Sequence, residues 1–152
     1  MWPGRAVATA HIESLRAARL RAAQLRVAAT ALEPFEHALL CGDFNLGRGE
    51  EAALAAALPR FSDLWPALRR AADAGDTFDP RRNAMLAARA GRPSGRRARF
   101  DRVLARLGPN LRASSIELVG LSPIGEDEHG KPLFPSDHFG VCAVLDPTPE
   151  PE

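Results

Sequence analysis

An amphipathic helical run enclosed by two short apolar runs is the feature that most constrains the fold of this chain. The first apolar run, Ala6 to Ala10, has the length and composition of a strand. Apolar residues then recur every three or four positions, as on one face of a helix, at Leu15, Ala18, Ala22, Leu25, Ala29 and Leu32. The second apolar run, His37 to Cys41, ends at Gly42 and predicts a buried strand. A strand, a helix and a strand in this order predict an α/β protein built of packed layers.

The rest of the chain continues this alternation. Ser14 is the predicted N-cap of the first helix, and Pro34 follows its end. We expect further helices at 49–58, 63–70 and 83–90, strands at 98–104, 114–119 and 139–145, loops at 76–80 and 121–135, and a turn at 91–95. The segment from Asp146 onward lacks core-forming residues, so we predict one domain over 1–146 and a disordered tail over 147–152.

The size and composition are those of a single soluble globular domain. The chain has 152 residues, of which 45% are hydrophobic and 26% are charged. No run is long enough to cross a bilayer, and the start of the chain lacks the apolar core of a signal peptide. We therefore expect an intracellular protein without a membrane partner, in the nucleus if the source is eukaryotic. Cys41 and Cys142 form no Cys-x-x-Cys pair, so neither a disulfide framework nor a structural zinc site is indicated.

A net charge of +1 conceals a local excess of positive charge. Nine arginines and a single acid, Asp101, lie between Arg81 and Arg106. Such a cluster suits phosphates or a polyanion. The alternative is a solvated loop in a chain that is rich in arginine throughout.

Polar side chains occur where predicted strands end, which is where α/β proteins gather their chemistry. Asp43 and Asn45 follow the second strand, and in an extended segment their spacing of two places both on one side. Asp-x-Asn is also common turn chemistry. Asp137 and His138 precede the last strand, and they can serve one site only if residues 136–138 form a turn.

Two further strand ends carry candidate residues. His11 follows the first strand, although a lone histidine is more often structural, and Asp101 lies between Arg99 and Arg102, where it can simply pair with a cation. The conjunction of four such strand ends favours a catalytic site over four unrelated features.

These residues stand in segments that resemble the C-terminal half of the endonuclease/exonuclease/phosphatase superfamily. The segments are TAHIESLR (9–16), CGDFNL (41–46), SDLW (62–65), DTFD (76–79), RFDRVL (99–104), SSIELVGL (114–121) and FPSDHFG (134–140). Within the superfamily they look most like the 5'-tyrosyl-DNA phosphodiesterases. The fold that the resemblance implies is half of a four-layer α/β sandwich, in which two facing sheets carry outer helices.

The resemblance also implies roles for the candidate residues. Asp43 orients and deprotonates the attacking water, and Asn45 holds the phosphate or that water. His138 binds the scissile phosphate, Asp101 keeps His138 cationic, and His11 contacts the phosphate from the other side. Asp137, with Asp43, lies at a divalent metal, Mg²⁺ or alternatively Mn²⁺. In-line attack on a phosphodiester requires a base, cations and a metal of this kind.

The substrate that the resemblance implies is the 5' end of single-stranded DNA carrying a tyrosyl adduct. The residues expected to bind it are Trp65, Phe78, Arg99 and Ser136. The two aromatic residues are equally well explained as part of the core.

The superfamily's N-terminal sheet, with its asparagine and its chief metal-binding glutamate, has no counterpart in the sequence. We therefore expect weak metal binding, an uncovered apolar sheet face, little activity of these residues alone, and a missing N-terminal half as the partner of that face. The alternatives are another nuclease or phosphatase of the superfamily, or a non-catalytic nucleic-acid-binding fragment that uses the arginine cluster.

Overall fold

The computed structural model describes residues 4–47, 49–89 and 96–149, and of residues 87–89 only the backbone. Its helices are α1 (Ala18–Leu32), α2 (Glu51–Ala57), α3 (Leu64–Leu68) and α4 (Ala84–Arg89). Its strands are β1 (Arg5–Thr9), β2 (His37–Asp43), β3 (Ser62–Asp63), β4 (Asp101–Arg106), β5 (Leu111–Val119), β6 (Gly125–Glu126), β7 (Pro132–Leu133) and β8 (Gly140–Pro147). The predicted α/β class is therefore confirmed.

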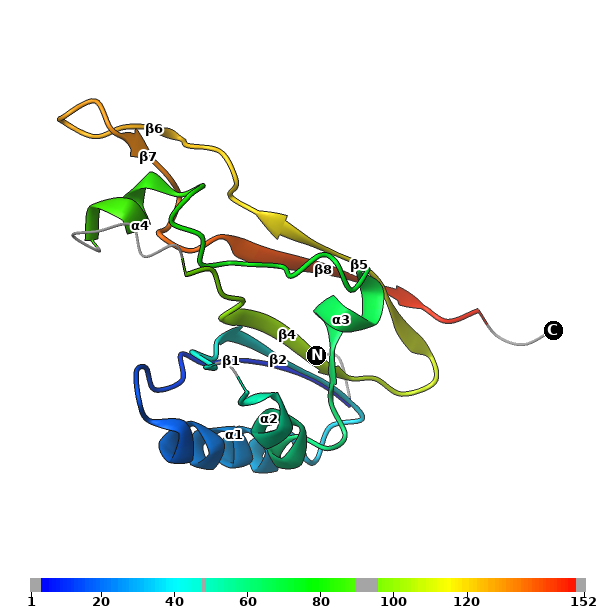
Figure 1. Ribbon diagram of the computed structural model, residues 1–152. Helices are drawn as coiled ribbons and strands as arrows, with labels where there is room; N and C mark the ends of the chain where they lie inside the picture. The colour runs from blue at the N-terminus through cyan, green and yellow to red at the C-terminus, as the bar shows by residue number, and fades with distance from the viewer. Residues whose placement is uncertain (1–3, 48, 90–95, 150–152) are drawn as a thin grey trace.

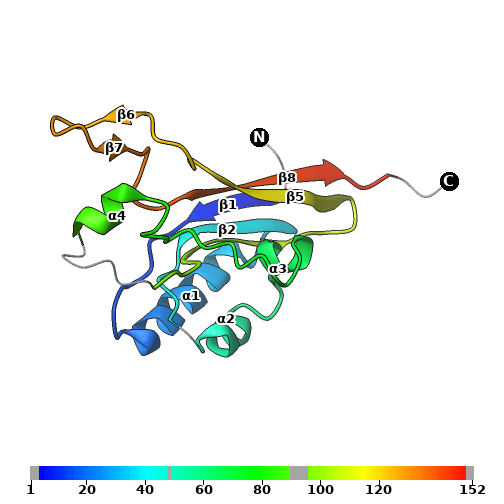
Figure 2. The same ribbon diagram turned by 45° about the horizontal axis from the view of Figure 1, so that its top comes forward.

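The main sheet has the strand order β1-β2-β4-β3. β1 and β2 are parallel and joined through α1, whereas β4 runs antiparallel to both of its neighbours. β5 and β8 form a second, antiparallel sheet that faces the first, and β6 and β7 form a hairpin that projects beside α4 (Figure 1). The main sheet consequently lies between a helical layer and the β5-β8 sheet (Figure 2).

Alternation along the strands builds a separate core on each face of the main sheet. Ala38 and Leu40 of β2 point toward α1 and α2, where they meet Leu25 and Leu32. The opposite face packs on the β5-β8 sheet through Leu39, Cys41, Val103, Ala105, Ile116, Val141 and Ala143. Of the described helices, none is long and apolar enough to span a membrane.

Helix α1 begins three residues later than the apolar spacing predicts. Leu15 is 89% exposed and has a left-handed backbone conformation, with φ of 59°. Ala17, not Ser14, is the N-cap, and it makes no side-chain capping hydrogen bond. The start is displaced because Arg21, buried on the helix, donates from Nη1 to the carbonyls of Glu13 and Leu15, which holds this segment outside the helix.

Other boundaries also differ from the predictions. β4 begins at Asp101 rather than Ala98, because Ala98 pairs with Phe78 in an isolated bridge. The β6-β7 hairpin lies within the predicted loop 121–135, and the short strand β3 was not predicted. β8 extends to Pro147, and the amide of Thr148 donates to Asn110, so order continues past 146. The predicted turn at 91–95 lies outside the described residues, and the domain limits remain predictions.

The inner face of the main sheet is only partly covered by the β5-β8 sheet. Val7 on β1 lies on the same face as Leu39 and is 73% exposed. An apolar groove of about 180 Å³ runs beside it, between β1 and the side chains of Leu111 and Leu145. An uncovered apolar face is what the sequence leads us to expect.

Candidate functional site

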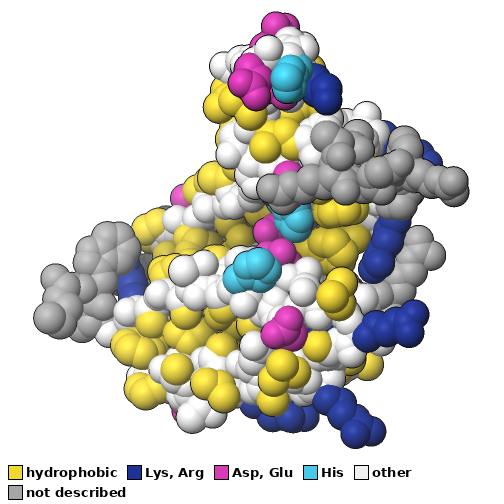
Figure 3. Space-filling model, turned by 90° about the vertical axis from the view of Figure 1, so that its left-hand side faces the viewer, with side chains coloured by type: hydrophobic (Ala, Val, Ile, Leu, Met, Phe, Trp, Pro, Cys, Tyr) yellow, Lys and Arg dark blue, Asp and Glu magenta, His cyan; other side chains and the backbone are white. Residues whose placement is uncertain are grey.

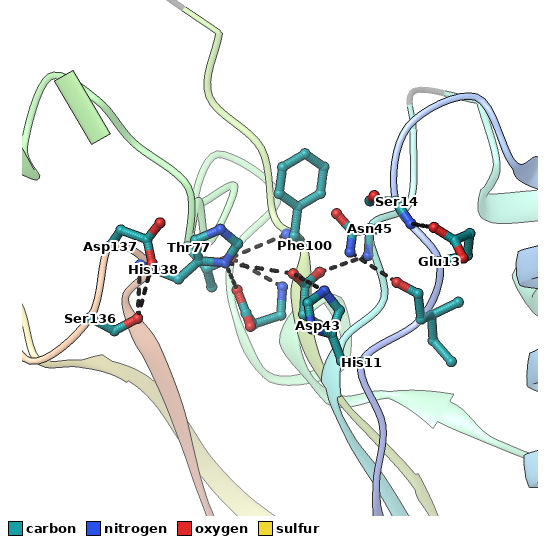
Figure 4. A network of polar contacts seen from close by, with 12 residues as sticks. His11, Glu13, Ser14, Asp43, Asn45, Thr77, Phe100, Ser136, Asp137 and His138 are labelled. Carbon is teal, nitrogen blue, oxygen red and sulfur yellow. Dashed lines mark hydrogen bonds and ion pairs between the residues drawn. The ribbon is translucent and has the colours of Figure 1, made fainter. Parts of the chain in front are cut away.

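Three titratable side chains meet at one edge of the main sheet. Asp43, at the end of β2, stands opposite Asp101, the first residue of β4, in the strand register. His138, two residues before β8, donates from Nδ1 to Oδ2 of Asp101 over 2.8 Å, and its Nδ1 lies 4.0 Å from Oδ2 of Asp43 (Figure 4). Predicted residues from three separate strands are thus brought together. Figure 3 shows histidine and acidic side chains gathered in a hollow on this face.

His11 and Asn45 lie on the other side of Asp43 (Figure 4). Nε2 of His11 is 3.6 Å from Oδ2 of Asp43, and three quarters of the His11 side chain is exposed. The backbone N–H of Asn45 donates to Oδ1 of Asp43, and Asn45 has a left-handed φ of 47°. The Asp-x-Asn segment is therefore a turn rather than an extended strand, yet both side chains remain at the site.

Gly42 explains how the segment after β1 approaches β2 so closely. Its φ is 132°, and a Cβ atom at this position would stand 2.0 Å from the carbonyl oxygen of Ala10. Only glycine fits such an approach. The amide of Ile12 can therefore donate to the carbonyl of Asp43, while the Asn45 side chain donates to the carbonyl of Ile12. This pairing fixes His11 beside the carboxylate.

Thr77 links the strand that carries Asp101 to the segment that carries His138. Its fully buried hydroxyl accepts the backbone N–H groups of Phe100 and Asp101, both at 3.1 Å. Its carbonyl accepts the N–H of Phe139 at 2.8 Å. In the sequence Thr77 belongs to the DTFD segment of the resemblance and to a predicted loop, but nothing local to it signals this positioning role.

A second buried polar residue, Asn83, supports the turn before β8. Its side-chain amide donates to the carbonyl of Ser136 at 2.9 Å. The hydroxyl of Ser136 accepts the N–H of His138 and lies 3.4 Å from a carboxylate oxygen of Asp137. The predicted turn at 136–138 is therefore present, and it sends the His138 ring toward Asp101 while Asp137 points the other way (Figure 4).

Hydrogen bonding, burial and nearby charge shift the pKa values of His138 and Asp43, which face each other in the cluster. The hydrogen bond that His138 donates to Asp101, aided by the charges of Asp101 and Asp43, raises the pKa of His138 above its ordinary value despite partial burial. Burial is the main cause that raises the pKa of Asp43, and repulsion by Asp101 adds to it. The imidazole is therefore biased toward its cationic form and Asp43 toward basicity.

The same cluster is a candidate divalent-metal site. Ligand atoms of Asp43, Asp101 and His138 lie within 4.8 Å of one another. Two carboxylates suit a hard cation, but Nδ1 of His138, the ring nitrogen that faces them, is occupied by its hydrogen bond to Asp101, so the protein ligands are few. Asp137, predicted as a metal ligand together with Asp43, is not in this group, and its role remains a prediction.

The four predicted substrate-binding residues are placed differently from one another. Phe78 lies at the site, with its ring edge-on to His138 at 5.5 Å, and Ser136 forms the adjoining turn. Trp65 is 4% exposed, packs in the core under β5, and donates from Nε1 to the carbonyl of Asp73, so it belongs to the core. Arg99 is bound to both carboxylate oxygens of Asp63, away from the cluster.

The arginine cluster is not one continuous positive surface. Arg102 is buried on the helix-facing side of β4, where it binds Glu51 and Asp63. Arg106 is buried on the same side and binds backbone carbonyls at the end of α1. The side chain of Arg89 and the whole of Arg92 lie outside the described residues. Because side chains alternate between the two faces of β4, Arg102 and Arg106 point into the protein and stabilise its interior instead of adding positive charge to the surface.

A cavity of about 740 Å³ opens beside the cluster. Asn45, Phe78 and Phe100 contribute to its wall, as do Ser14, Leu15 and Arg96. Phe78 and Phe100 also contact the ring of His138, at centroid distances of 5.5 and 6.1 Å. The two phenyl rings thus border both this cavity and the imidazole.

Comparisons with known proteins agree with the resemblance seen in the sequence. Tyrosyl-DNA phosphodiesterase 2 of Bos taurus is 31% identical over 149 residues, which cover 91% of this chain and 37% of the relative. The structure of D. rerio TDP2 complexed with single-strand DNA product has a TM-score of 0.73 at 24% identity, over 92% of this chain and 55% of that one. An endonuclease/exonuclease/phosphatase family protein from Bacteroides thetaiotaomicron has a TM-score of 0.58 at 18% identity, over 91% and 48%. No protein-family model matches the chain.

These matches confirm the predicted fold and its partial extent. The chain spans about half of the solved structures and little more than a third of the curated relative. The relatives are hydrolases of the phosphodiesterase kind, as expected. The chain thus has part of the endonuclease/exonuclease/phosphatase fold, and over that part it resembles tyrosyl-DNA phosphodiesterase 2.

Proposed function

We propose that this chain carries the phosphate-binding and catalytic part of a divalent-metal-dependent phosphodiesterase that acts on 5'-phosphotyrosyl ends of single-stranded DNA. The observation that carries the proposal is the cluster of Asp43, Asp101 and His138 at one sheet edge. The similarity to a TDP2 structure that holds a single-stranded DNA product supports the choice of substrate class.

His138 is the proposed phosphate-binding cation. Its Nδ1 is held by Asp101, so Nε2 is the nitrogen that can donate to a phosphate oxygen. The raised pKa favours the protonated ring, and a fixed cation stabilises the charge that develops on the transferred phosphoryl group.

Asp43 is the proposed base for the attacking water. Its Oδ1 accepts from Asn45, which leaves Oδ2, between His11 and His138, to take a proton. A carboxylate whose pKa is raised by burial is a stronger base than a solvated one. His11, on the far side of Asp43, is placed to contact the same phosphate.

A bound Mg²⁺ or Mn²⁺ would supply Lewis-acid stabilisation of the phosphoryl oxygens, held chiefly by the carboxylates of Asp43 and Asp101. The leaving group makes a small demand on the protein. A tyrosyl phenol has a pKa of about 10, so it departs as a phenolate with little help from a general acid.

The uncovered apolar face suggests that the site is completed by further protein. Val7 and the groove beside β1 lie where a second sheet would pack, and about half of the solved structures and nearly two thirds of the curated relative have no counterpart in this chain. We accordingly propose that these residues alone bind a phosphorylated 5' end but hydrolyse it poorly, because two protein carboxylates hold a hard cation weakly.

Hydrolysis of a 5'-phosphotyrosyl oligonucleotide in Mg²⁺ tests this proposal, with a 5'-phosphorylated product as the readout. We expect at most slow turnover by the chain, abolished by Asp43→Ala and His138→Ala but retained in His129→Ala, which changes a remote hairpin histidine. Faster cleavage of an abasic duplex, poly(A) or a phospholipid would favour another enzyme of the superfamily. Salt-sensitive DNA binding that is indifferent to His138→Ala would favour a non-catalytic module.

A further inference from the structure

Leu15 is an apolar residue held in an unfavourable position for no evident packing reason. Its side chain is 89% exposed and its backbone φ is 59°. A branched apolar residue rarely adopts this conformation, and an exposed leucine gains nothing from burial to offset the strain. Strain of this kind persists where the surroundings over-determine it, and it gathers at functional sites.

The surroundings that hold Leu15 are visible. Arg21, which is 2% exposed, donates from Nη1 to the carbonyl of Leu15 at 2.9 Å and to that of Glu13 at 3.0 Å. The other side of its guanidinium makes a bidentate pair with Glu50, at 2.8 and 2.6 Å. Glu50 in turn accepts the N–H of Gly47. One buried ion pair thus fixes the segment before α1 against the segment after β2.

This ion pair holds Leu15 in the wall of the 740 Å³ cavity. Phe78 and Phe100, which contact the ring of His138, line the same cavity. An exposed leucine and two aromatic rings form an apolar surface beside the imidazole of His138, the proposed phosphate-binding group. A flat aromatic ring attached to a phosphate matches this combination, since the ring is apolar and the phosphate anionic.

We propose that Leu15 is a specificity-determining residue that packs against a planar aromatic ring next to the phosphate bound by His138. The inference rests on the proposed function and deepens it. The ring can come from the terminal nucleobase or from the aryl leaving group. Arg21 and Glu50 act as positioning residues that present Leu15 to the cavity.

Fluorescence anisotropy in EDTA tests the proposal with three probes: a 5'-phosphorylated oligothymidylate, the same strand with an abasic first nucleotide, and the same strand with a 5'-phenyl phosphate ester. The variants are Leu15→Asn and Leu15→Gly, since both asparagine and glycine tolerate a positive φ. Leu20→Asn, half exposed on α1 and not part of the cavity wall, is the matched control. Thermal melting of each variant is recorded in parallel.

We expect both Leu15 variants to bind the probe that carries the recognised ring, either the terminal nucleobase or the phenyl ester, about tenfold more weakly than the wild type does. This loss is equivalent to about 1.4 kcal/mol, and Leu20→Asn should show no loss. A loss that disappears with the abasic probe identifies the nucleobase, and a loss seen only with the phenyl ester identifies the leaving group. The melting temperature of Leu15→Asn should equal or exceed that of the wild type, because asparagine tolerates the positive φ and backbone strain is relieved.

Two results would overturn the inference while leaving the proposed function standing. One is that both Leu15 variants bind all three probes as tightly as the wild type does, provided that the wild type binds the probes through their 5' phosphate group. The other is a lower melting temperature of Leu15→Asn, which would assign Leu15 to packing. If the wild type binds the 5'-phosphorylated strand no more tightly than the same strand with a 5' hydroxyl, the proposed function itself fails.

Discussion

Replacement of Arg21 by methionine tests whether the buried ion pair holds the site segments together. The substitution keeps an unbranched side chain of similar length and removes four hydrogen bonds, two to Glu50 and two to the carbonyls of Glu13 and Leu15. The Glu50 carboxylate, whose side chain is 18% exposed, would then lack its cation. Loss of one partner of a buried pair costs about 3–5 kcal/mol.

That cost is a large part of the stability of a single domain, which is about 5–15 kcal/mol. For a domain of this size each kcal/mol lowers the melting temperature by about 2–4 °C, so we expect a drop of roughly 6–20 °C. Urea unfolding followed by circular dichroism gives the free energy directly. Arg60→Met is the control, because Arg60 and Glu33 form an ion pair in which both side chains are about two-thirds exposed, and such pairs contribute about 1 kcal/mol or less.

The double variant Arg21→Met/Glu50→Gln separates the pair from its parts. If the ion pair accounts for the effect, the double variant loses clearly less stability than the sum of the two single variants. Equal losses in Arg21→Met and Arg60→Met would refute the reasoning, because they would show that burial adds nothing to this pair.

Three other predictions concern the groups that surround His138. Thr77→Val removes the acceptor of two backbone amides and should cost about 1–3 kcal/mol for each amide left unsatisfied, whereas Thr30→Val, on the exposed face of α1, should cost little; urea unfolding distinguishes them. Asp101→Asn should lower the pKa of His138, because the hydrogen bond and negative charge that favour the imidazolium are weakened; NMR titration of the ring in EDTA measures this, with Asp127→Asn as the control. In the wild type the Asp101–His138 pair should stabilise the fold fully below the unfolded histidine pKa of about 6.5, and this stabilisation should disappear as the pH rises through the higher folded value; in Asp101→Asn that pH dependence should be smaller.

The parts of the fold that were predictable from sequence are those set by local patterns. The apolar run before Gly42 and the spacing along α1 depend on periodicity, so β2 and most of α1 stand where expected. The start of α1 was misplaced because Arg21, six residues away, captures the carbonyl of Leu15. No periodic signal reports a hydrogen bond of that kind.

In the candidate site, too, residues marked by local sequence patterns were predictable, and residues that depend on long-range contacts were not. Asp43, Asp101 and His138 were identifiable because strand ends meet at one edge, and the structure brings them together. For Trp65 the sequence left a substrate wall and the core equally open, and the structure places it in the core, because its burial depends on β5, far along the chain. Thr77 and Asn83 went unnoticed because their partners lie 23 to 53 residues away, and nothing near them in the sequence marks a long-range acceptor or donor.

The most direct measurement of the central claim compares the affinity of the chain for single-stranded oligonucleotides that end in a 5' phosphate or a 5' hydroxyl. If His138, held by Asp101, is the phosphate-binding group of a phosphodiesterase site, the phosphate end binds more tightly to the wild type, and His138→Ala abolishes that preference while His129→Ala keeps it. Equal affinity for both ends, or a preference that survives in His138→Ala, would contradict the account.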